Sequence, residues 1–443
     1  MLLHSNFNEY SFSDLKEFLA EYQYVFRVSL KSLCFWYPGI KHTYAKIPFG
    51  KHIWYDSQIV NMAVNRQLAL AEKQPFAKIS NPYLKGFIDG LVHLKNPYVR
   101  IYYMYRVLKP HYLNKFEQHL VSTDIDLDYG TYSFLDFSIN YLREEIKESL
   151  PILEVLEDEY DLNKDSELIT RLNQLWIAYQ KSQLDDNYNN NSLLMMSVEL
   201  TAKEHQRRLD KPERDVPVVQ PQKNEVLDNT QIDLSNQDFK IAYLYANGYL
   251  ELQASEIIAS MIFEYFDTEW KIITDLSRQL YDECRHAQLC FRRMEELGGY
   301  LGQYTTSLLQ WNYVHLGSNL VEKFIIQHRI SEGTGTDASF NNVTRFREMG
   351  DEKTAKLYEF IGADEILHVK MGNKWIEHFL PDPIKRDEVI NKTKNRIISY
   401  LEQEGYHIDF LSCVPVALEH RELAGFKAEE IKDIVLERNE RCS

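Results

Sequence analysis

Two short runs of this sequence share one pattern, Asp282-Glu283-Cys284-Arg285-His286 and Asp364-Glu365-Ile366-Leu367-His368. Both lie within segments whose hydrophobic spacing predicts an α-helix. On a helix, residues three apart lie on one face, so the glutamate and the histidine of each run can offer an oxygen and a nitrogen to one metal ion. Two such helices, with one more glutamate from each of two others, form the carboxylate–histidine site of a di-metal helical bundle.

The two runs belong to a repeated arrangement. Glu251 precedes Glu283 by almost the same interval as that by which Glu332 precedes Glu365, and the two intervals differ by a single position. At a helical rise of about 1.5 Å per residue, each interval accommodates roughly two four-turn helices and a short turn. Turn-forming residues lie near the middle of both intervals. A hairpin of this kind brings its two glutamates to the same height, so the repeat favours a shared site over a surface pattern of ion pairs.

A third Glu-x-x-His occurs at Glu404 and His407. A bare pattern of this kind is expected about once by chance in a chain of this length. Gly405 lies inside it, and glycine is less favourable than alanine in a helix by about 1 kcal/mol. We interpret this pair as a chance occurrence.

The predicted metal site has six ligands, with one alternative. Glu256 lies five residues after Glu251, about 140° further around the helix, so the two side chains face different directions. We prefer Glu251 because its spacing matches the second half of the repeat. Carboxylates and imidazoles without thiolates favour iron or manganese. The predicted ligands are Glu251 (or Glu256), Glu283, His286, Glu332, Glu365 and His368.

An aspartate precedes the glutamate in each run. A metal-bound histidine usually donates its other N–H to a carboxylate or a carbonyl. We therefore predict that Asp364 holds His286 and that Asp282 holds His368. The alternative is that each aspartate is a solvent-facing helix residue.

The residues after Glu332 are unusual for a helix, since Gly333 and Gly335 follow it closely. Glycine disfavours helix interiors, so we predict that the helix breaks or distorts just after Glu332. The alternative is a simple loop. His328, one turn earlier, is a candidate for an extra ligand, although a hydrogen-bonded core histidine is the preferred interpretation.

Composition limits the function classes. The formal net charge is −16 and the pI is near 5.4, which argues against nucleic acid as a partner. The five cysteines are scattered, without a C-x-x-C pair, so neither a disulfide framework nor a thiolate metal site is indicated. Neither a signal peptide nor a hydrophobic run of membrane-spanning length is apparent. We expect a cytoplasmic protein that does not bind membranes.

Hydrophobic periodicity and breaks in composition divide the chain into four segments, and the predicted fold class is all-α. The linker is polar and contains prolines, together with a short helix near 193–208. The predicted segments are an N-terminal helical domain at 1–183, the linker at 184–238, a four-helix bundle with the metal site at 239–380, and a helical C-terminal extension at 381–443.

The motifs of the bundle occur in order: Glu251-Leu252-Gln253-Ala254 with Glu256, then Asp282 to His286, then Glu332 with Gly335 and Asp337, then Gly350-Asp351, and finally Asp364 to Val369 with Gly372 and Trp375. In these motifs, the segment from about Leu250 to Trp375 resembles a bacterial ferritin-like family long known as a domain of unknown function. The first motif also resembles the first ligand helix of rubrerythrin-type proteins. The family tends to have a histidine where this chain has Tyr249. The resemblance implies a ferritin-like bundle and a metal site, but no substrate.

The leading functional hypothesis is a non-haem di-iron oxygenase or oxidase that activates O2 to oxidise a small organic substrate. Its cofactors would be two iron ions, or one manganese and one iron. Electrons would come from a separate reductase or from the substrate. The alternatives are a ferroxidase or peroxide-handling rubrerythrin-like protein, and a non-enzymatic ferritin-like scaffold. A homodimer through helix faces is a further expectation.

Overall fold

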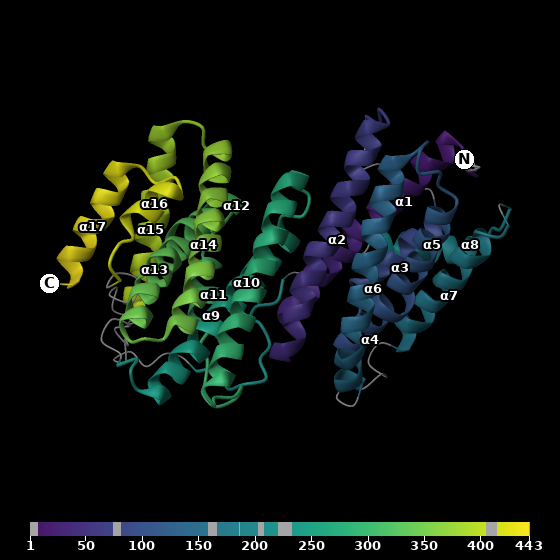
Figure 1. The fold of residues 1–443 in the computed structure, drawn as a ribbon. Helices are drawn as coiled ribbons and strands as arrows, with labels where there is room; N and C mark the ends of the chain where they lie inside the picture. Colours follow the sequence, from purple (N-terminus) through teal and green to yellow (C-terminus); the bar gives the residue numbers. More distant parts are fainter. Residues whose placement is uncertain are drawn as a thin grey trace, which may run out of the picture. The chain divides into compact units, whose positions relative to one another are not determined.

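The computed structural model describes residues 8–73, 81–157, 166–185, 187–202, 208–219, 233–404 and 414–442. Within these ranges the chain forms helices and turns and no strand, so the predicted all-α fold is confirmed. The chain divides into two compact units. Figure 1 shows its helices, coloured from the N-terminus to the C-terminus. One comprises residues 1–212 and 262–266, and the other comprises residues 213–261 and 267–443. No helix among the described residues is long and apolar enough to cross a membrane.

The N-terminal unit is built from long antiparallel helices and shorter ones packed against them. A capping box between Ser11 and Asp14 begins the first helix. The last helix of the unit, α8 (Asn191–Ala202), lies within the segment predicted as the linker. It packs on α3 (Pro82–Leu91), where a Cβ at Gly86 would clash with Ser197. The rest of the short helix predicted there, residues 203–207, lies outside the described residues. The helices are α1 (Phe12–Trp36), η1 (Tyr37–Gly39), α2 (Thr43–Ala69), α3 (Pro82–Leu91), α4 (Pro97–Tyr102), η2 (Tyr103–Leu108), α5 (Lys109–Val121), α6 (Tyr129–Glu157), α7 (Ser166–Ser182) and α8 (Asn191–Ala202).

The C-terminal unit contains the predicted bundle and the C-terminal extension. Three consecutive elements follow one another without a break: α12 (Leu320–Phe324), η4 (Ile325–Glu332) and α13 (Gly333–Glu348). Of these, η4 is a π-helical segment. The turn between α13 and α14 contains Gly350, whose φ of +75° suits glycine. The helices are α9 (Gln237–Glu264), α10 (Trp270–Glu296), α11 (Leu309–Val314), α12 (Leu320–Phe324), η4 (Ile325–Glu332), α13 (Gly333–Glu348), α14 (Glu352–Phe379), α15 (Pro383–Gln403), α16 (Leu418–Leu423) and α17 (Ala428–Cys442).

Close helix packing in this unit depends on small residues at the crossings. A Cβ at Gly248 of α9 would clash with the ring of Phe291 on α10. A Cβ at Gly372 of α14 would clash with Cβ of His328 on η4. Neither position has room for a side chain, so both crossings bring the backbones of ligand-bearing helices close together.

The C-terminal extension is attached to the bundle by a buried ionic cluster. Asp337 of α13 accepts hydrogen bonds from Arg421 Nη2 at 2.6 Å, from Arg438 Nη2 at 2.7 Å and from the backbone N–H of Ala417 at 2.9 Å. The Asp337 side chain is fully buried. An apolar cluster of Val369, Ala424, Phe426 and Ile431 joins the extension to α14. The extension therefore contacts the helix that continues directly from Glu332.

Candidate metal centre

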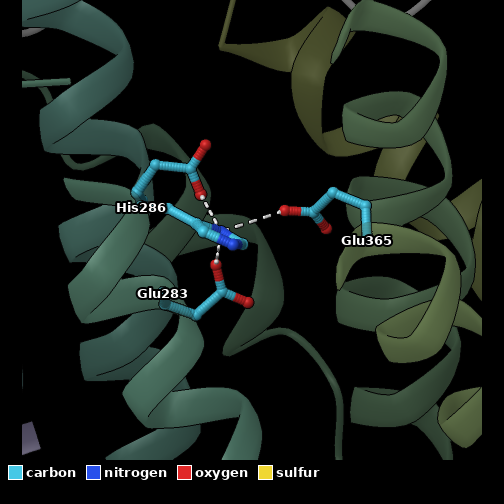
Figure 2. Close-up of side chains that lie close together, drawn as sticks. Glu283, His286 and Glu365 are labelled. Carbon is cyan, nitrogen blue, oxygen red and sulfur yellow. Dashed lines mark ion pairs between the residues drawn. The ribbon is translucent and has the colours of Figure 1, made fainter. Parts of the chain in front are cut away.

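Four helices of the C-terminal unit bring the six preferred ligands together in its interior. Each helix contributes one glutamate, and α10 and α14 also contribute one histidine each. Figure 2 shows Glu283 and Glu365 reaching toward His286 from two different helices. The contributors are Glu251 from α9, Glu283 and His286 from α10, Glu332 from the end of η4, and Glu365 and His368 from α14.

One half of the cluster is centred on His286. Its Nδ1 lies 3.6 Å from Glu251 Oε2, 3.5 Å from Glu283 Oε2 and 3.4 Å from Glu365 Oε1. These four groups can all direct a ligand atom at a single point, since the atoms lie within 4.8 Å of one another.

The other half is centred on His368. Its Nδ1 lies 3.2 Å from Glu283 Oε1, 3.4 Å from Glu365 Oε2 and 4.0 Å from Glu332 Oε2. Glu283 and Glu365 therefore present one oxygen to each histidine. The cluster thus contains two adjacent four-residue groups that could each hold a metal ion. They share two carboxylates, and Glu251 belongs to one group and Glu332 to the other.

Buried ligand atoms without a hydrogen-bond partner indicate whether metal ions would fit between these residues. Buried polar atoms nearly always have a hydrogen-bond partner. Here, four buried atoms that face the two positions have none: Glu283 Oε2, His286 Nδ1, Glu365 Oε2 and His368 Nδ1. Across the part of the chain that is described, the four carboxylates form ion pairs with histidines and none with lysine or arginine. The residues thus fit a pair of divalent cations, whose charge would balance the carboxylates.

Without ions the cluster holds protons. Burial raises the pKa of Glu251 to about 8 and that of Glu332 well above its ordinary value. Burial alone would lower the pKa of His286 and of His368, but the surrounding carboxylates outweigh it and raise both pKa values well above the usual range. Near neutral pH both imidazoles are therefore protonated and paired with carboxylates.

Metal binding should consequently release protons and strengthen as the pH rises. A histidine must be neutral to coordinate an ion, and these two are charged in the ion-free protein because their pKa values are raised. Isothermal titration with Mn²⁺ at about pH 6 and about pH 8, in buffers of different protonation enthalpy, measures both effects. Equal affinity at the two pH values, with no dependence on the buffer, would contradict the prediction.

The two aspartates lie beside the histidines with which the sequence pairs them. Asp364 Oδ2 lies 3.2 Å from His286 Nε2, and Asp282 Oδ2 lies 3.6 Å from His368 Nε2. Each contact crosses between α10 and α14 and leaves the Nδ1 of its histidine facing the cluster.

Arg285, which the sequence analysis did not single out, contacts both aspartates: its Nη2 lies 2.8 Å from Asp282 Oδ1 and 2.5 Å from Asp364 Oδ2. Its position three residues after Asp282 is the signal that could have identified it.

Replacing Asp364 by asparagine should weaken metal binding by about 10–100-fold, as changes to groups that orient metal ligands typically do. Asparagine keeps the size of the side chain but loses the charge that stabilises the His286 N–H. Titration of the ion-free variant with Mn²⁺ measures the loss. Wild-type affinity would show that this contact does not support the ligand.

Two buried glutamines, also missed from the sequence, hold the carboxylates on one side. Gln279 Nε2 donates to Glu283 Oε1 at 3.0 Å and to Glu332 Oε1 at 3.3 Å, and Gln327 donates to Glu332 Oε1. His328 Nε2 lies 2.7 Å from Gln279 Oε1, and burial lowers its pKa to about 3. His328 is therefore a neutral core histidine that orients Gln279, which agrees with the preferred interpretation.

Glu256, the alternative for the first position, does not join the cluster. Its carboxylate is fully buried and pairs through both oxygens with Arg214, at 2.6 Å for Nη2 and Oε2. The five-residue offset from Glu251 places it on another face of α9, as helix geometry requires. Of the third Glu-x-x-His pair, Glu404 follows the end of α15, and His407 lies outside the described residues.

The helix distortion predicted after Glu332 lies before it instead. The π-helical segment η4 ends at Glu332, and Gly333 and Gly335 continue as regular α-helix in α13. A π-helical turn contains more residues than an α-helical one, and such turns are frequent at functional sites. Gly333 lies in a close contact, since a Cβ there would lie 2.9 Å from Arg421 Nη1, whereas a Cβ at Gly335 would meet the Glu365 carboxylate only at 3.9 Å, an ordinary contact distance.

Comparison with protein families matches residues 166–432, more than half of the chain, to the model described as "Protein of unknown function (DUF455)". Searches of the curated proteins and of the solved structures give no match.

Proposed function

The chain belongs to the protein family of unknown function DUF455, and we propose that it is a non-haem oxygenase or oxidase. In this proposal the cluster holds two iron ions, or one manganese and one iron, in a ferritin-like bundle, and O2 oxidises a small organic substrate. The observation that carries it is the pair of four-residue groups that share Glu283 and Glu365.

The ligand types support a redox-active pair of ions. Four carboxylates and two imidazoles suit iron and manganese, and the absence of thiolates among them disfavours zinc of the structural kind. Two Fe(II) ions in such a site supply electrons for the reduction of O2. Further electrons would come from a separate reductase or from the substrate.

The surrounding residues have distinct roles in this proposal. Glu283 and Glu365 would hold both ions, since each presents one oxygen to His286 and the other to His368. Asp282 and Asp364 would orient the histidines: Asp364 Oδ2 lies within hydrogen-bond distance of His286 Nε2, and Asp282 forms an ion pair with His368. Burial of the cluster excludes bulk water, which strengthens each electrostatic interaction within it.

The experiment is metal analysis followed by reaction with O2. We expect about two metal ions per chain, iron alone or iron with manganese, in protein from supplemented cells. The Fe(II)-loaded protein should consume O2, and a screen of small organic compounds should give oxidised product. Glu283→Ala is the matched control and should show neither metal nor O2 uptake.

Other outcomes identify the alternatives. Rapid oxidation of Fe(II) without organic product would instead support iron or peroxide handling. A well-folded protein that resists reconstitution with metal would contradict the proposal and support a binding scaffold.

A further inference from the structure

We infer that the two ion positions are unequal: the position at His368 and Glu332 is rigid and binds its ion first, whereas the position at His286 and Glu251 is weaker and exchangeable. This inference rests on the proposed metal centre and assigns different tasks to its two halves. It follows from the groups that hold the two unshared glutamates, Glu332 and Glu251.

Glu332 is held in place before any ion arrives. Its Oε1 accepts hydrogen bonds from Gln279 at 3.3 Å and from Gln327, so its Oε2 is left facing His368. The two glutamines are themselves held, because Gln279 contacts His328 at 2.7 Å and Gln327 accepts from Gln310 at 3.4 Å. A ligand oriented in this way loses little conformational freedom on binding, which increases affinity.

The shared carboxylate Glu283 shows the same difference between the positions. Its Oε1, which faces His368, accepts a hydrogen bond from Gln279 at 3.0 Å. Its Oε2, which faces His286, has no hydrogen-bond partner among the described residues. The amide donors thus all act on two of the three glutamates that surround His368, Glu283 and Glu332, whereas Glu365 Oε2 has no hydrogen-bond partner among the described residues.

Glu251 lacks such support and is the most exposed ligand. In the described part of the chain it forms an ion pair only with His286, at 3.6 Å, and no side-chain amide donates to it. Its side chain is 17% exposed, compared with 6% for Glu332 and 3% or less for Glu283 and Glu365. Glu251 must therefore be ordered when the ion binds, and it can move aside when another ligand approaches.

The contacts of the two histidines differ in the opposite sense. His286 lies closer to its aspartate, at 3.2 Å, than His368 does, at 3.6 Å. Asp282 is, however, the more buried of the two aspartates, with 4% exposure against 19% for Asp364. His286 Nε2 is hydrogen-bonded to Asp364, whereas His368 Nε2 forms an ion pair with Asp282 and has no hydrogen-bond partner among the described residues. We weigh this contact less than the two amide donors on Glu332, because those donors act directly on a charged ligand.

With unequal positions, the exchangeable ion lies on the Glu251 side of the centre. The residue that opens its coordination is on α9, and the rigid ion is enclosed by α10, η4 and α14. In the proposed function, the side formed by His286 and Glu251 would then be the side of the centre that is open to a further ligand, and Glu332 and its two glutamines would keep the other side fixed.

Stepwise loading of the full-length, ion-free protein with Mn²⁺ tests the inference, with free Mn²⁺ followed by electron paramagnetic resonance and stoichiometry by native mass spectrometry. We expect two binding phases whose affinities differ by about tenfold or more. Glu251→Gln should remove the weaker phase and leave one tightly bound ion. Gln279→Met, and separately Gln327→Met, should weaken the tighter phase by about 10–100-fold.

The outcomes separate this inference from the proposed function. A single phase of two equal ions, or loss of the tight phase in Glu251→Gln, would overturn the inference. Two unequal phases in a protein that consumes no O2 would leave the inference intact and contradict the proposed function. Failure of the wild-type protein to bind Mn²⁺ would contradict both. Circular dichroism of each variant shows whether the helical fold is kept, and the two glutamine variants check one another.

Discussion

Replacing Glu283 by alanine should leave a helical protein that retains neither ion. Glu283 presents Oε2 to the His286 position and Oε1 to the His368 position, so one substitution removes a ligand from both. Glu365→Ala should have the same effect, because Glu365 divides its oxygens between the two histidines in the same way. The expected change in metal content is therefore from about two ions per chain to about none.

The measurement is elemental analysis of purified variants, combined with circular dichroism to verify the fold. Glu256→Gln is the matched control, because Glu256 is a buried glutamate of the same unit that pairs with Arg214 and lies outside the cluster. It should retain both ions. Full metal content in Glu283→Ala would show that the ions bind elsewhere.

Replacing Asp337 by alanine should give the largest loss of stability. The substitution removes the carboxylate that pairs with both Arg421 and Arg438, whose side chains are only 4% and 10% exposed. Breaking a buried ion pair by removing one partner typically costs about 3–5 kcal/mol, because the remaining charge stays buried and unpaired. The backbone N–H of Ala417 would lose its acceptor as well.

Urea unfolding of the full chain, with hydrogen exchange followed by mass spectrometry, locates this effect. Exchange should increase in α16 and α17, and the unfolding midpoint of the C-terminal unit should fall. Glu359→Ala is the control: its pair with Arg347 is about half exposed, with 49% and 44% exposure, and should contribute less than about 1 kcal/mol. A similar, small change in both variants would mean that the extension does not depend on Asp337.

Much of the centre was predictable because its signal is local. The two Glu-x-x-His runs follow from the helical period alone, and the nearly equal intervals that lead up to them identify Glu251 and Glu332. The same period predicted the all-α fold and placed Glu256 on another face of its helix. The aspartate–histidine contacts across α10 and α14 were also predictable. In two matched runs that face one another, the aspartate of each run lies opposite the histidine of the other.

Other features depend on contacts between residues far apart in the chain. Gln279 and Gln327 are ordinary helix residues until packing places them against Glu332, 53 and 5 residues away. The π-helical segment lies before Glu332, and there His328 packs against Gly372, a residue 44 positions away in the chain. Helix propensity, which is a local quantity, placed the distortion after the glutamate instead.

By itself, the sequence determined the helical class of the fold and predicted the groups of the site, with Glu251 preferred to Glu256, and the pairing of each histidine with an aspartate, since all of these follow from periods of three to four residues and from one repeat. The tertiary structure decided which oxygens face which histidine, which carboxylates lie between both histidines, and which glutamate accepts hydrogen bonds from buried amides. These depend on distances between side chains of different helices, and such distances are set by close packing at the crossings rather than by any local pattern.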